Sequence, residues 1–182
     1  MRFGYLTVLL SLTAAVAGAQ TSASASARSD AIAASFNKFK SMSKEKHGVK
    51  KEKYLRVQTE PAVRQNPADY SGRYDVPDMD FSVEFRVNQD GTFTGNGYEP
   101  LSDDVKRTFT LRDGRIRGAL ATATKVYANG ASEPFEGVFM NRSVYESPTD
   151  KGTTIFGFGA LTRPIVMHGQ TIEKLFYDKS QQ

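Results

Sequence analysis

Serines that precede a lysine by three residues are the first feature of this chain that could do chemistry. The spacing occurs at Ser35, Ser41 and Ser43, and in a serine hydrolase the lysine of such a motif can act as the base. The motifs Ser-Asp-Asn, Lys-Thr-Gly and Gly-x-Ser-x-Gly, which would complete or replace such a site, do not occur. We therefore expect these serines to lie on a solvated helix face and assign no catalytic residue.

Cysteine and histidine usage limits the remaining chemistry. The 182 residues include no cysteine and only two histidines, His47 and His168, which excludes a cysteine nucleophile, a thiolate zinc site and a three-histidine metal site. Asp75, Asp78 and Asp80 could offer oxygens to calcium, but the glycine-punctuated spacing of a known calcium loop is missing. The sequence predicts no metal site and no cofactor.

Carboxylates on predicted strands leave one enzymatic alternative open. Two acids that face each other inside a barrel could hydrolyse a glycosidic bond. The candidates lie in or beside β-rich segments and are Glu84, Glu136, Glu146 and Glu173. An envelope hydrolase is therefore kept as an alternative, although the missing catalytic motifs favour a protein that is not an enzyme.

The strongest charge signal is local. Residues 38–56 hold eight cations and two acids, a net +6 against +4 for the whole chain. Such a segment can attract anionic surfaces such as lipid headgroups or cell-wall polymers, but the favoured interpretation is a solvated helix and linker that aid solubility. The candidate residues for anionic-surface binding are Lys44, Lys46, Lys50 and Lys51. Because no array of aromatic side chains accompanies them, nucleic acid is not an expected partner.

Aromatic residues suggest a second kind of site. Fifteen Phe and Tyr residues lie between Tyr70 and Tyr177, many at alternating positions, and most are expected to form the core. A wide barrel would leave some of them around a cavity for a small apolar ligand, with Gly95, Gly97, Gly157 and Gly159 thinning its wall. The predicted pocket-lining residues are Phe81, Phe85, Phe93 and Phe109.

Short strands and tight turns must position these residues. Phe81 to Val87 alternates between apolar and polar side chains, and Asn88-Gln89-Asp90-Gly91 is a hairpin signal. Further turns are predicted at 112–114, 129–130 and 149–152, and expected strands cover 70–76, 81–87, 92–98, 106–111, 115–127, 135–145, 153–158, 164–168 and 171–177. The sequence predicts a mainly β fold, an antiparallel meander of about eight strands that closes into a small barrel.

The N-terminal segment predicts export and one helix. A short positive start, an apolar run and Ala17-Gly18-Ala19 are typical of a signal peptide over residues 1–19, and no transmembrane segment is expected. Residues 20–28 are predicted to be a disordered Ser/Ala leader. An amphipathic helix is expected from about Asp30 to Lys46, stopped by Gly48, with one apolar face formed by Ile32, Phe36, Phe39 and Met42.

The opening of the β-rich region resembles known modules. Tyr70-Ser71-Gly72-Arg73-Tyr74, followed by Pro77 and an Asp90-Gly91 turn, resembles small β-barrel accessory modules found beside serine β-lactamase-like hydrolases. It is also similar to a lipocalin opening, with Tyr74 where that family has tryptophan. The resemblance covers residues 69–97 and implies a barrel, but it carries over no catalytic residue.

These observations define the expected organisation and function. We expect a signal peptide over 1–19, the leader over 20–28, the helix, basic segment and connector over 29–68, and the barrel over 69–182. The expected protein is an exported, non-catalytic binding or interaction module of a bacterial periplasm or secretion. Its partner would be an anionic envelope component or a small apolar ligand, and in the latter case the protein would be a lipocalin-like carrier.

Overall fold

Ten antiparallel strands, one α-helix and one short 3-10 helix make up most of the described residues. The computed structural model describes residues 13–46, 48–102, 105–167 and 169–180. The helices are α1 (Thr13–Ser35) and the short 3-10 helix η1 (Pro67–Tyr70). The strands are β1 (Lys38–Lys46), β2 (Val49–Pro61), β3 (Gly72–Asp75), β4 (Ser82–Val87), β5 (Thr92–Ser102), β6 (Val105–Arg117), β7 (Leu120–Tyr127), β8 (Ser132–Tyr145), β9 (Thr153–Met167) and β10 (Gln170–Lys179).

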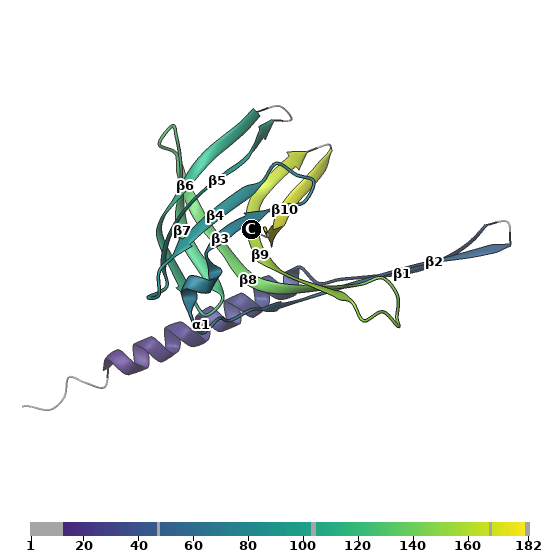
Figure 1. The fold of residues 1–182 in the computed structure, drawn as a ribbon, viewed down its shortest axis with the longest axis horizontal. Coiled ribbons are helices and arrows are strands. Elements are labelled where there is room, and N and C mark those ends of the chain that lie inside the picture. Colours follow the sequence, from purple (N-terminus) through teal and green to yellow (C-terminus); the bar gives the residue numbers. More distant parts are fainter. Residues whose placement is uncertain (1–12, 47, 103–104, 168, 181–182) are drawn as a thin grey trace, which may run out of the picture.

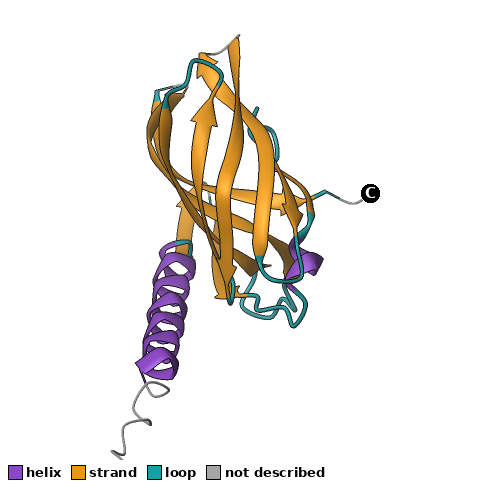
Figure 2. Ribbon diagram, turned by 90° about the vertical axis from the view of Figure 1, so that its left-hand side faces the viewer, coloured by secondary structure: helices purple, strands orange, loops and turns teal. Residues whose placement is uncertain are grey.

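Strands β3 to β10 form a closed up-and-down barrel (Figure 2). Each strand pairs with the next along the chain, and β10 returns to pair with β3. The turn from Asn88 to Gly91 joins β4 to β5, and Gly91 adopts a φ of 77°, where a side chain would strain the backbone. The prediction of an eight-stranded antiparallel barrel with an N-terminal helix is confirmed.

Several strand boundaries differ from the prediction. Residues 112–114 form a bulge within β6 rather than a turn, with Asp113 at a φ of 55°, and the chain reverses instead between β6 and β7. The segments 153–158 and 164–168 belong largely to one strand, β9. Polar turn residues also occur in bulges, so turn composition alone does not separate the two.

Aromatic rings fill the barrel interior below its upper end, which is the end with the β5–β6 connection in Figure 1. Phe85 lies at the centre of the cluster, with ring centroids 5.5 Å from Phe93, 5.2 Å from Phe139 and 4.9 Å from Phe158. Two glycines make room for these rings, since a Cβ on Gly97 would lie 2.5 Å from Phe109 and one on Gly137 would lie 2.3 Å from Phe158. The glycines therefore serve dense packing of the interior.

The predicted helix and leader are both corrected. The helix ends at Ser35, and residues 38–46 form β1, paired with β2. Lysines at 38, 40, 44 and 46 follow the period of two of a strand, and this pattern competes with the helical spacing from Ile32 to Met42. Gly48 is part of the β1–β2 connection, with a φ of 74°. His47 lies outside the described residues.

Residues 20–28 are helical and not disordered. Alanine has the highest helix propensity, and small side chains let α1 lie close to the outer wall of the barrel. The buried helix residues Ala25, Ile32 and Ala33 pack in one cluster with residues from β7, β8 and β10, together with Ala119. The prediction failed because it treated the lack of large side chains as a lack of packing.

Candidate functional site

The four predicted pocket-lining residues lie in the packed core. Phe81, Phe85, Phe93 and Phe109 are 1%, 1%, 2% and 4% exposed and belong to one buried cluster. Ring contacts join Phe85 to Phe93, and Phe109 to Tyr127 at 6.4 Å. The structure thus places these four side chains in the packed core of the barrel.

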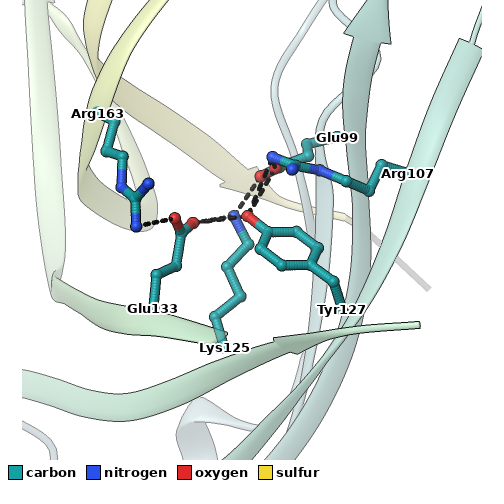
Figure 3. Close-up of polar contacts among 6 residues, drawn as sticks. All are labelled: Glu99, Arg107, Lys125, Tyr127, Glu133 and Arg163. Atoms are coloured by element: carbon teal, nitrogen blue, oxygen red, sulfur yellow. Dashed lines mark hydrogen bonds and ion pairs between the residues drawn. The ribbon is translucent and has the colours of Figure 1, made fainter. Parts of the chain in front are cut away.

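A charged cluster lies near the upper end of the barrel, and its side chains are drawn in Figure 3. It comes from five consecutive strands, β5 to β9, and consists of Glu99, Arg107, Lys125, Tyr127, Glu133 and Arg163. Lys125 contacts the carboxylates of both Glu99 and Glu133, the latter at 3.3 Å. Glu99 and Lys125 are 5% and 8% exposed, so this ion pair is buried, and buried charged groups are normally paired.

Tyr127 links the two acids of this cluster. Its hydroxyl lies 2.9 Å from Glu99 Oε1 and 2.6 Å from Glu133 Oε1. Burial and hydrogen bonds to the two carboxylates raise the pKa of Tyr127, which keeps it protonated as a donor. Burial alone would raise the pKa of Glu133, but the Tyr127 hydroxyl and the Lys125 ammonium together lower it.

The charged cluster leaves little space for a substrate. The adjoining cavity has a volume of about 50 Å³ and is bounded by Glu99, Lys125, Glu133, Arg163 and neighbouring residues. That volume suits one or two water molecules. The carboxylates of the cluster are already paired with cations. The cluster is therefore a structural network of polar side chains at this end of the barrel.

Sequence reasoning missed these residues although a signal was present. Glu99 continues the inward series Phe93, Gly95 and Gly97, and Lys125 and Tyr127 alternate along β7 in the same way. The carboxylates proposed for an envelope hydrolase do not converge. Glu84 pairs with Arg86 at 3.3 Å, Glu136 pairs with Arg28 of α1, and Glu146 and Glu173 are exposed.

An open cleft of about 530 Å³ crosses the outside of β3 to β7. Its lining includes Arg73, Glu84, Asn96, Tyr98 and Arg112. Glu84 is the one carboxylate among the lining residues, so the cleft offers no acid and base pair. Among the described residues, no group of three or more His, Asp or Glu side chains could hold a metal ion.

The basic segment forms a two-stranded hairpin that projects from the barrel (Figure 1). Arg56 to Pro61 of β2 pair with β8, whereas residues 49–55 pair with β1 alone among the described strands. Directly paired residues of an antiparallel ladder share a face. The register therefore assigns each residue of the hairpin to one of two faces.

One of these faces carries most of the positive charge. We call it the lysine face; its residues are Lys38, Lys40, Met42, Lys44, Val49, Lys51, Lys53, Leu55 and Val57. No acid occurs among them. The opposite face holds two cations and two acids and consists of Phe39, Ser41, Ser43, Glu45, Lys50, Glu52, Tyr54 and Arg56. The net positive charge of the hairpin thus lies on the lysine face, because the charges of the opposite face cancel.

The predicted anionic-surface residues divide between these faces. Lys44 and Lys51 are directly paired on the lysine face, and the backbone of Lys46 pairs with Val49 at the end of the same row. Lys50 lies on the opposite face, 3.6 Å from Glu52. The structure therefore groups Lys44 and Lys51 with Lys38, Lys40 and Lys53, which the candidate set omitted.

Comparisons with known proteins give no assignment. Among the described residues, no helix is long and apolar enough to cross a membrane. No family model matches the chain, and searches of curated proteins and of solved structures find no match. The resemblance of residues 69–97 to accessory modules thus stays a prediction.

Proposed function

We propose that this protein is a non-catalytic binding module that attaches to anionic surfaces through the lysine face of the β1–β2 hairpin. The observation that carries the proposal is the segregation of charge by register: five lysines with described side chains lie on one face without an acid. Local concentration of one charge sign produces an attractive field even though the whole chain is only +4.

Protection of a sheet edge does not account for this arrangement. Lysines on an edge strand prevent unwanted strand pairing whichever face they occupy. Here the hairpin has its acids on one face only, and Lys44 lies directly opposite Lys51 on the other. Like charges directly opposite destabilise a ladder, and an anion between the two ammonium groups removes that repulsion.

Export is part of the proposal. Residues 1–19 have the pattern of a signal peptide, and removal of those residues would leave Ala25, Ile32 and Ala33, the buried contacts of α1, in place. The binding surface would then meet the anionic polymers and lipids of a bacterial envelope. Amino-terminal sequencing of protein recovered from the producing cells tests this step, with Gln20 as the expected first residue.

Retention on phosphocellulose across a salt gradient tests the binding function. The variant K40Q/K44Q/K51Q/K53Q removes four charges from the lysine face and is expected to elute at markedly lower salt. Each lysine near an anionic surface contributes about 1 kcal/mol at physiological salt, so the summed loss is large.

A matched control separates the surface from the net charge. The variant K50Q/R86Q/R112Q/R115Q removes four exposed cations at other positions and gives the same net charge. It is expected to elute close to the unmodified protein. Equal shifts for both variants would show that net charge alone governs retention and would refute the proposal.

The two alternatives from the sequence receive less support. A carrier of an apolar molecule needs interior space, and Phe85, predicted to line that space, is in ring contact with Phe93, Phe139 and Phe158. A hydrolase needs two free carboxylates in a cleft, and the paired acids Glu99 and Glu133 adjoin a cavity of about 50 Å³.

A further inference from the structure

We infer that the surface bound by the lysine face is a bilayer containing anionic phospholipid, and not a soluble polyanion. This inference rests on the proposed function and goes beyond it by naming the partner. It is carried by the apolar side chains that alternate with the lysines, by the shape of the hairpin and by its position relative to the barrel.

Apolar side chains on the lysine face are open to solvent. Met42 and Val49 are 48% and 58% exposed, and Met42 is paired directly with Lys53 in the ladder. A bilayer interface receives both kinds of group, because ammonium groups meet lipid phosphates while apolar side chains enter the boundary of the acyl chains. A soluble polyphosphate would neutralise the lysines but leave Met42 and Val49 in water.

The hairpin depends on a partner more than the barrel strands do. Residues 49–55 of β2 and their partners in β1 form a part of the hairpin with two strands and no covering layer among the described residues. Isolated two-stranded hairpins are marginally stable in water. Its opposite face has one contact between two rings in the described part of the chain, Phe39 to Tyr54 at 5.8 Å. A planar surface against the lysine face would supply the missing layer.

The row of the lysine face continues onto the outer side of the barrel. Thr59 continues this row, and its hydroxyl lies 3.0 Å from Oδ1 of Asn37, which follows α1. Helix α1 lies on the outer wall of the barrel, so at Thr59 the row is directed away from the barrel interior. Figure 1 shows the hairpin extending beyond the barrel, with α1 reaching in the opposite direction along the same side.

The closing experiment compares two anionic probes on the whole chain. One is a vesicle of equimolar phosphatidylcholine and phosphatidylglycerol, with pure phosphatidylcholine as the baseline, and the other is soluble long-chain polyphosphate. The variant M42S/V49T keeps every charge. We expect roughly tenfold weaker vesicle binding, since each side chain buries part of its apolar surface, and unchanged polyphosphate binding.

A control variant removes exposed apolar groups elsewhere. Phe39 on the opposite face and Val63 in the connector are each 68% exposed, and F39S/V63T is expected to bind both probes as the unmodified protein does. Thermal unfolding of each variant verifies that the fold is kept. Equal losses for M42S/V49T and F39S/V63T on vesicles would refute the assignment to the lysine face.

The remaining outcomes separate the inference from the proposed function. If M42S/V49T binds vesicles normally while K40Q/K44Q/K51Q/K53Q loses binding to both probes, the bilayer is refuted and anionic binding stands. If the lysine variant keeps its binding to both probes, the proposed function itself is refuted. If the lysine variant loses both and M42S/V49T loses only vesicles, the inference is supported.

Discussion

Lys125 holds two carboxylates in the upper end of the barrel, and its role can be tested by removing the ammonium. Its side chain is 10% exposed and contacts Glu99 and Glu133. Lys125→Met fills much of the same volume but leaves both acids without this cation. Loss of one partner from a buried ion pair costs about 3–5 kcal/mol, and we expect a decrease of that size in the free energy of unfolding by urea.

A weaker ion pair in the same cluster is the matched control. Arg163 lies 2.9 Å from Glu133, but its side chain is 73% exposed. Exposed ion pairs contribute about 0–1 kcal/mol, so Arg163→Gln is expected to lower the free energy of unfolding by no more than about 1 kcal/mol. Similar losses for Lys125→Met and Arg163→Gln would contradict the buried role of Lys125.

The ionised state of Glu133 makes stability depend on pH. Burial opposes its charge, but Tyr127 and Lys125 outweigh burial and lower the pKa of Glu133 below its usual value of 4.5. A carboxyl whose folded-state pKa is lower stabilises the fold above the unfolded-state pKa, and this contribution is lost as the pH falls through the folded-state pKa. Urea midpoints measured from about pH 6 to pH 3 should fall, and Glu133→Gln should flatten the decline. An unchanged decline would assign it to other acids.

At the scale of elements, Ile32 and Phe39 show how far sequence periodicity reaches. Both were predicted on one helix face; Ile32 is 1% exposed on α1, while Phe39 is 68% exposed on β1. Ile32→Ala should lower the free energy of unfolding by about 2–5 kcal/mol, since it leaves a cavity against β8. Phe39→Ala should cost less than about 1 kcal/mol. Comparable losses, measured by urea unfolding, would favour the helix predicted from the sequence.

The wrong prediction of a helix through Phe39 and Met42 has a physical cause. From Ile32 to Met42 the apolar residues fit a helical period, while the lysines from 38 to 46 fit a strand period. Pairing with β2 favours the strand over the helix, because the backbone groups of β1 pair with β2 over nine residues. The existence of the basic segment could be predicted from the sequence, but the lysine face could not, because a face of a hairpin exists only once the register is fixed.

At the scale of the molecule, the barrel was predictable and its contents were only partly so. Tight turns and alternating segments favour an antiparallel meander, and closure removes the sheet edges. Whether aromatics such as Phe85 line a cavity or fill it depends on which rings meet across the barrel. That depends on register and on glycines such as Gly97 and Gly137, which admit the rings of Phe109 and Phe158.

Closure of the barrel depends on its shortest seam, between β3 and β10. Within the described part of the chain, two residue pairs join these strands, Asp178 with Asp75 and Lys179 with Tyr74, against nine between β5 and β6. Ser180 reinforces the seam, since its amide donates to Arg73 O at 2.9 Å and its hydroxyl donates to Asp75. We expect this seam to open first, because local opening follows the number of cooperative contacts.

Hydrogen exchange of backbone amides measures this opening. The amide of Ser180 should exchange faster than those of central β5 and β6, and Asp75→Asn should accelerate it further. Burial opposes the charge of Asp75, but hydrogen bonds from Ser180, Ser82 and Arg73 lower its pKa, so acidification through that pKa should also weaken the seam. Asp90→Asn, in the β4–β5 turn, should leave the exchange of Ser180 unchanged. Uniform exchange across the barrel would instead mean that all eight strands open together.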